Sequence, residues 1–187
     1  MAIITRDWIR TYSASKGFLF AERKSLDNLG KRIKAAASRP AYDVFLSHRY
    51  ADREELSVLL SIIETAGISV FVDWRDSNLS REHVTRETAS SLKDTMQRCK
   101  ALLFVITSTS SGSIWMPWEL GLFDGMGGKV AIVPIARSSA DFPGQEYAGL
   151  YPWIDTASLD NSTNPTLWVN FSRQHYVKLN EWLAGTG

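Results

Sequence analysis

After Pro40 the chain alternates between short, almost uniformly apolar runs and longer segments in which apolar residues recur every three or four positions. The apolar runs predict buried strands, and the segments with helical spacing predict amphipathic helices. The predicted strands cover residues 42–47, 68–74, 101–107 and 129–135. The predicted helices cover a segment capped by Asp52 and ended by Gly67, a segment near 82–98 and a compact segment near 115–125. This order of strands and helices is typical of right-handed βαβ units and predicts an α/β fold with a parallel sheet.

Strands as apolar as these are expected where helices cover both faces of a parallel sheet, so we expect flanking helices on each side. A weaker pattern predicts a fifth strand near 151–154. Toward the C-terminus, large residues at helical spacing predict a closing helix on the body, with a stripe of Trp168, Phe171, His175, Leu179 and Trp182. Because His175 lies on that stripe, we interpret it as a core histidine and not as a ligand.

The first 40 residues differ from the rest of the chain in charge. They hold nine lysines and arginines against three acidic residues, whereas the remainder holds 12 basic and 17 acidic residues, for a net charge of +1. Residues 22–37 predict a short helix. We therefore divide the chain into a basic helical N-terminal extension, residues 1–40, and a main domain, residues 41–187.

The extension lacks the dense charge clusters and interleaved aromatic residues that favour nucleic acid or membranes. We expect it to pack on its own domain or on a neighbouring subunit, with contact to nucleic acid or a membrane as the weaker interpretation.

The cysteine content and the hydropathy of the sequence indicate the cellular compartment in which the protein is expected. Cys99 is the only cysteine in the sequence, which excludes a disulfide scaffold and fits a reducing environment. No stretch approaches the roughly 20 apolar residues that span a bilayer. The N-terminus places charged residues where a signal peptide would have its apolar core. We expect a cytoplasmic protein.

Ligands of doubly wound sheets bind at the carboxyl ends of the strands, and the residues there exclude several common chemistries. The first strand continues into SHRYAD (47–52), which has none of the glycines of a dinucleotide-binding loop. The glycine-rich GMGGK (125–129) leads from a helix into a strand, the reverse of a phosphate loop, and is interpreted as a helix C-terminus. Three scattered histidines and one cysteine predict no metal site, and no Ser-His-Asp order suggests a hydrolase triad.

One cluster remains, at the start of the 115–125 helix, where the sequence reads SIWMPWELG (113–121). Trp115, Glu119 and Phe123 are four residues apart and therefore share one face of the helix. A carboxylate between two aromatic rings, near the carboxyl end of a strand, fits an ionised functional group that the helix dipole favours. The alternative is a glutamate that only complements this dipole. The spacing by itself does not decide between the two.

Three sequence blocks together carry a family resemblance. YDVFLSHRYAD (42–52), GISVFVDWRD (67–76) and SIWMPWELG (113–121), in this order and spacing, resemble the three blocks of TIR (Toll/interleukin-1 receptor) domains. The resemblance covers about residues 41–135 and extends to bacterial standalone TIR proteins, including those of Thoeris-type antiphage systems. It implies a flavodoxin-like, doubly wound parallel five-stranded sheet with flanking helices.

The resemblance also implies an activity. Many TIR domains cleave NAD⁺, releasing nicotinamide and forming ADP-ribose, a cyclic ADP-ribose isomer or a conjugate. Their essential glutamate lies four residues after the tryptophan of the third block, which assigns catalysis to Glu119. The resemblance implies NAD⁺ as substrate, with no metal and no resident cofactor. Six further residues are assigned to substrate binding: Ser47, His48, Arg49, Asp73, Trp115 and Trp118.

The chemistry of NAD⁺ explains why a single carboxylate would suffice. Nicotinamide leaves as a neutral pyridine, so the reaction needs no general acid, unlike ordinary glycoside hydrolysis. An ionised Glu119 that hydrogen-bonds the ribose hydroxyls would stabilise the oxocarbenium-like ribosyl cation. Trp115 or Trp118 would stack on the nicotinamide ring, and Arg49 suits the pyrophosphate. His48 stands where family members commonly have tyrosine.

Two other functions remain open at this point. The chain could be a non-enzymatic TIR scaffold that acts by assembly, because adaptors of that kind also carry the third block. It could also be a small nucleotide-binding protein on a flavodoxin-like sheet. Arg49 and Asp73 favour the enzyme. We further expect self-association through TIR–TIR contacts that involve the 73–82 loop, and a downstream effector that senses the nucleotide product. The sequence leaves the product, the trigger and the assembly state open.

Overall fold

A computed structural model describes residues 3–16, 39–49, 52–72, 86–137, 149–157 and 165–186. Three predictions fall outside these residues: the helix at 22–37, the loop at 73–82 and the side chain of Asp73. Within the described part of the chain, no helix is long and apolar enough to cross a membrane.

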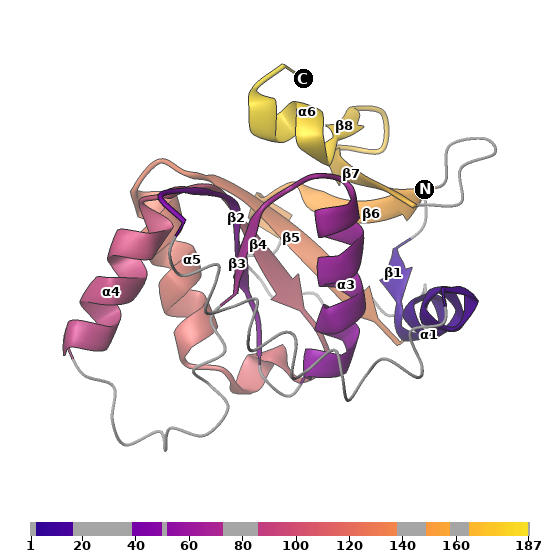
Figure 1. The fold of residues 1–187 in the computed structure, drawn as a ribbon, viewed down its shortest axis with the longest axis horizontal. Coiled ribbons are helices and arrows are strands. Elements are labelled where there is room, and N and C mark those ends of the chain that lie inside the picture. The colour runs from indigo at the N-terminus through magenta and orange to yellow at the C-terminus, as the bar shows by residue number, and fades with distance from the viewer. Residues whose placement is uncertain are drawn as a thin grey trace.

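Five parallel strands form the centre of the sheet, as predicted (Figure 1). They are β2 (Tyr42–Ser47), β3 (Val70–Val72), β4 (Cys99–Ile106), β5 (Lys129–Ala136) and β6 (Trp153–Ala157). Their order in the sheet is β3-β2-β4-β5-β6, and each neighbouring pair is parallel. Counted from the first of the five, this is the order 2-1-3-4-5 of a flavodoxin-like sheet. The α/β fold class and the doubly wound topology are confirmed.

Helices cover both faces of the sheet (Figure 1). On one face α3 (Arg53–Thr65) packs through Leu56 and Ile63 in a cluster with Val44. The other face is covered by α4 (Arg86–Met96) and α5 (Trp115–Gly125), whose apolar side chains form a second cluster with the opposite side of the same strands. The strands are therefore apolar on both faces because both faces are buried.

The N-terminal segment adds a strand and a helix that the hydrophobic pattern did not predict. The strand β1 (Ile4–Thr5) pairs in parallel with the end of β5, with Ile4 opposite Ile135. The helix α1 (Arg6–Ser15) follows directly, and the Thr5 hydroxyl caps it by accepting a hydrogen bond from the Trp8 backbone N–H at 3.1 Å. α1 lies against α3. Residues 3–16 of the predicted extension therefore pack on their own domain.

The predicted closing helix with the 168–182 stripe is largely wrong. The chain instead forms β7 (Thr166–Asn170) and β8 (Tyr176–Lys178), both antiparallel, and only the short helix α6 (Leu179–Ala184). Leu167 and Val169 are buried at alternate positions, which is strand periodicity. His175 is exposed at the hairpin and stacks on Phe171 with ring centroids 4.8 Å apart, so its interpretation as a core histidine is also wrong.

Candidate functional site

The carboxyl end of β2 meets the first turns of α5 through a hydrogen bond between two side chains. The hydroxyl of Ser47, the last residue of β2, donates to Glu119 Oε2 at 2.5 Å. Ser47 is 1% exposed and Glu119 is 6% exposed. Since burial of a carboxylate is costly without hydrogen-bond donors, the Ser47 hydroxyl offsets part of that cost. A glutamate that only complemented the helix dipole would gain that benefit at the surface, so its burial favours the functional interpretation.

Two tryptophans lie one turn apart in the same part of α5. Trp115 is half-buried and packs against the apolar cluster beneath the helix. Its ring meets that of Trp118 edge to face, with centroids 5.3 Å apart, and Trp118 is 39% exposed. Neither ring is sequestered in the core. Both offer aromatic surface close in sequence to Glu119.

His48 and Arg49 follow Ser47 at the end of β2. His48 is buried, and its Nδ1 lies 3.2 Å from the Leu46 carbonyl oxygen. Because a carbonyl only accepts, Nδ1 is the protonated ring nitrogen in this contact. Arg49 is half-buried, and its guanidinium donates to the Thr109 carbonyl. A Cβ at Gly112 would lie 2.7 Å from Arg49 Nη1, so the glycine leaves room for the guanidinium.

A buried polar network under the Arg49 contact was not predicted. Asp52, 2% exposed, accepts hydrogen bonds from the hydroxyls of Thr107 and Thr109, each at 2.8 Å. Asp52 is the N-cap residue of α3, as predicted, but its side chain makes no capping hydrogen bond. The signal in the sequence was the run of hydroxyl residues TSTSS (107–111) directly after an apolar strand.

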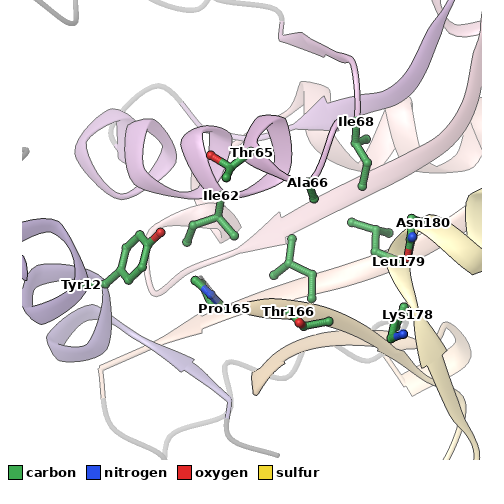
Figure 2. Close-up of a pocket in the computed structure, with 11 residues that line it drawn as sticks. Tyr12, Ile62, Thr65, Ala66, Ile68, Pro165, Thr166, Lys178, Leu179 and Asn180 are labelled. Carbon is green, nitrogen blue, oxygen red and sulfur yellow. The ribbon is translucent and has the colours of Figure 1, made fainter. Parts of the chain in front are cut away.

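Ser47, Glu119, His48 and Arg49 therefore gather where β2 and β4 end, which is where doubly wound sheets bind ligands. A separate cavity of about 300 Å³ lies between α1, the end of α3 and the β7–β8–α6 region (Figure 2). Its lining includes none of the predicted site residues. Among the described residues, no group of three or more histidines, cysteines, aspartates or glutamates is arranged to hold a metal ion.

The topology and this site define a doubly wound α/β domain with a buried carboxylate at the carboxyl edge of its sheet. Residues 44–167 match the TIR domain family, and the chain belongs to that family. It is 43% identical over 175 residues to the "Probable 3' cyclic ADP-D-ribose synthase ThsB'" of Bacillus cereus (strain MSX-D12), with 91% of each chain covered. It is also 33% identical over 97 residues to the "Putative cyclic ADP-D-ribose synthase TIR2" of Cytobacillus dafuensis, covering 50% of this chain and 26% of that protein.

Proposed function

We propose that this TIR domain cleaves the bond between nicotinamide and ribose in NAD⁺, that Glu119 is the catalytic residue, and that the product is a cyclic ADP-ribose. The observation that carries the proposal is the buried Glu119 carboxylate held by Ser47 at the carboxyl edge of the sheet. The names of the two similar proteins, both cyclic ADP-D-ribose synthases, support the substrate and the product.

The chemistry requires one anion and no external acid. When the bond between the ribose C1 and the nicotinamide nitrogen breaks, its electron pair stays on nicotinamide, which leaves neutral. The positive charge moves to the ribosyl group, where the Glu119 carboxylate stabilises it. A hydroxyl oxygen of the same molecule then bonds to that carbon and loses its proton, which the carboxylate can accept. Attack by water at the same carbon would give linear ADP-ribose.

The neighbouring side chains bind and orient the substrate in this proposal. Trp115 and Trp118 offer flat apolar surface for the nicotinamide ring, and the Arg49 guanidinium suits a pyrophosphate. Ser47 holds the carboxylate, and His48 and Asp73 complete the set of substrate-binding residues. Bound substrate would exclude water from the site. The lower local dielectric constant then strengthens the interaction between the carboxylate and the developing cation.

The test is incubation of the purified protein with NAD⁺, followed by chromatography and mass identification of nicotinamide and of the ribosyl product. We expect nicotinamide and a product with the mass of cyclic ADP-ribose. Glu119→Gln should abolish both while keeping the melting temperature. Asp94→Asn removes an exposed carboxylate on α4 and serves as the matched control. Full turnover by Glu119→Gln would refute the assignment of the catalytic residue.

We also propose that activity depends on self-association, with the 73–82 loop at the contact, and that a downstream effector senses the product in the cytoplasm. Ile114, 83% exposed, is the N-cap residue of α5, four positions before the exposed Trp118, and these two apolar side chains support a contact with a second protein. The same pair supports the second candidate function, a non-enzymatic scaffold. If activity per molecule stays constant over about a hundredfold dilution, during which sizing shows only monomer, then activity does not require self-association.

A further inference from the structure

Thr109 connects the predicted substrate arginine to the core of the domain through three separate contacts. Its carbonyl accepts from the Arg49 guanidinium, and its hydroxyl donates to Asp52 Oδ1 at 2.8 Å. Its backbone N–H donates to the Thr107 hydroxyl oxygen at 3.1 Å, and that hydroxyl in turn donates to Asp52 Oδ2 at 2.8 Å. The Thr109 carbonyl also accepts a hydrogen bond from the Gly112 backbone N–H at 3.2 Å. Its position therefore depends both on this turn and on the Asp52 carboxylate, which holds the Thr109 side chain.

Asp52 also contacts Arg49 directly, through the backbone. Its N–H donates to the Arg49 carbonyl oxygen at 3.0 Å. The contacts close a ring: the Arg49 backbone is held by Asp52, Asp52 holds Thr109, and Thr109 holds the Arg49 guanidinium. A long arginine side chain loses considerable rotamer freedom when it binds a ligand, and a ring of this kind removes part of that freedom before binding.

Arg6, the first residue of α1, forms an ion pair with the buried Asp52 carboxylate. Arg6 Nη2 lies 3.7 Å from Asp52 Oδ1, and Arg6 Nε lies 3.0 Å from Glu55 Oε1. Arg6 follows β1 directly, so the pairing of Ile4 with Ile135 on β5 fixes where its backbone begins. The N-terminal segment thus reaches the ring from outside residues 44–167, which match the family.

We propose that Asp52, Thr109 and Arg6 are positioning residues for Arg49, so that the β1–α1 segment takes part in binding the pyrophosphate of NAD⁺. This inference rests on the role given to Arg49 under the proposed function. Because Arg49 would bind a part of the substrate that does not react, disturbing its position should raise KM for NAD⁺ and leave kcat nearly unchanged. Loss of folded protein would instead lower the active fraction and leave KM as it was.

The test compares isosteric or near-isosteric variants of the full chain, assayed by nicotinamide release over a range of NAD⁺ concentrations. Thr109→Val removes the hydroxyl and keeps the carbonyl that Arg49 needs, and we expect KM to rise about five- to tenfold with kcat within about twofold. Thr109→Ser keeps the hydroxyl and should restore the parent KM. Arg6→Gln should raise KM about threefold. Arg10→Gln is the matched control on α1, because Arg10 is 79% exposed, and should leave KM unchanged.

A double-mutant cycle with Arg49→Ala separates this inference from the function on which it rests. Arg49→Ala should raise KM by itself, and adding Thr109→Val or Arg6→Gln to it should raise KM no further. An additive effect, or a parent KM in Thr109→Val, would overturn the positioning role while leaving Arg49 as a binding residue. A parent KM in Arg49→Ala would overturn its role in binding, and with it this inference. Glu119→Gln reports separately on the catalytic assignment.

Discussion

Ser47→Ala removes the hydroxyl that donates to the Glu119 carboxylate, and we expect it to slow nicotinamide release without unfolding the protein. The bond is short, 2.5 Å between Ser47 Oγ and Glu119 Oε2, and both residues are almost completely buried. Water therefore cannot easily reach the Glu119 carboxylate to donate a hydrogen bond in place of the lost hydroxyl. The carboxylate would be left less well oriented for the cation that forms on the ribose.

The magnitude follows from the kind of bond that is lost. A hydrogen bond to a charged group contributes about 1.5–3 kcal/mol when one partner is removed. If the transition state depends on the full contribution, that loss corresponds to about a 10- to 150-fold fall in kcat. KM should change less, because in the proposed mechanism the carboxylate acts on charge that develops only as nicotinamide leaves.

Ser69→Ala is the matched control. The Ser69 hydroxyl donates to Asp43 Oδ2 at 2.7 Å, so this variant also removes a serine–carboxylate hydrogen bond. Ser69 lies just before β3, at the opposite end of the sheet from the site. We expect it to lower the melting temperature and leave kcat unchanged. The assay is the initial rate of nicotinamide release, with the melting temperature measured on the same samples.

Two results would refute the reasoning. A parent kcat in Ser47→Ala would mean that Glu119 does not need this donor. Equal losses of kcat in Ser47→Ala and Ser69→Ala would mean that the effect reports on general destabilisation and not on the carboxylate.

Two further substitutions and one labelling experiment test other parts of the structure. Gly112→Ala places a Cβ 2.7 Å from Arg49 Nη1, so we expect a higher KM for NAD⁺ in steady-state kinetics with little change in melting temperature; an unchanged KM would contradict the placement of the guanidinium. Burial raises the pKa of the Cys99 thiol to about 12, so a thiol reagent at pH 8 should label the folded protein far more slowly than the unfolded chain. Burial also raises the pKa of Asp155 above its usual 3.8, against a hydrogen bond with Asn170 that lowers it. The folded state therefore loses stability as pH rises from about 4, because the unfolded chain ionises more readily. Asp155→Asn removes that loss, so denaturant titrations should show the stability of this variant relative to the parent rising between pH 4 and pH 7.

Local pattern in the sequence determined the central part of this fold. The apolar runs that become β2, β4 and β5 are buried on both faces, and a strand in that environment has almost no polar position. The segment SIWMPWELG predicted the start of α5 and placed Trp115 and Glu119 on one face of that helix. These features depend on residues close together in the sequence, so the spacing of apolar residues was enough to predict them.

The C-terminal hairpin and the N-terminal strand were decided by tertiary structure. Large residues spaced three or four apart between 168 and 182 fit a helix, yet Leu167 and Val169 are buried as members of a strand because β6 offers an edge for antiparallel pairing. β1 has two residues, too few for any periodicity, and it exists because the end of β5 accepts it as a partner.

The assembly of the site also depended on the tertiary structure. Ser47 and Glu119 are 72 positions apart in the chain, and Thr109 lies 60 positions from Arg49. The resemblance assigned several of these residues to one site, but the partner of each side chain follows from strand order and register. Sequence periodicity carries information about which face of an element is buried. It carries none about which neighbour that face will meet, and for this reason the bond between Ser47 and Glu119 and the ring around Arg49 emerged only from the folded chain.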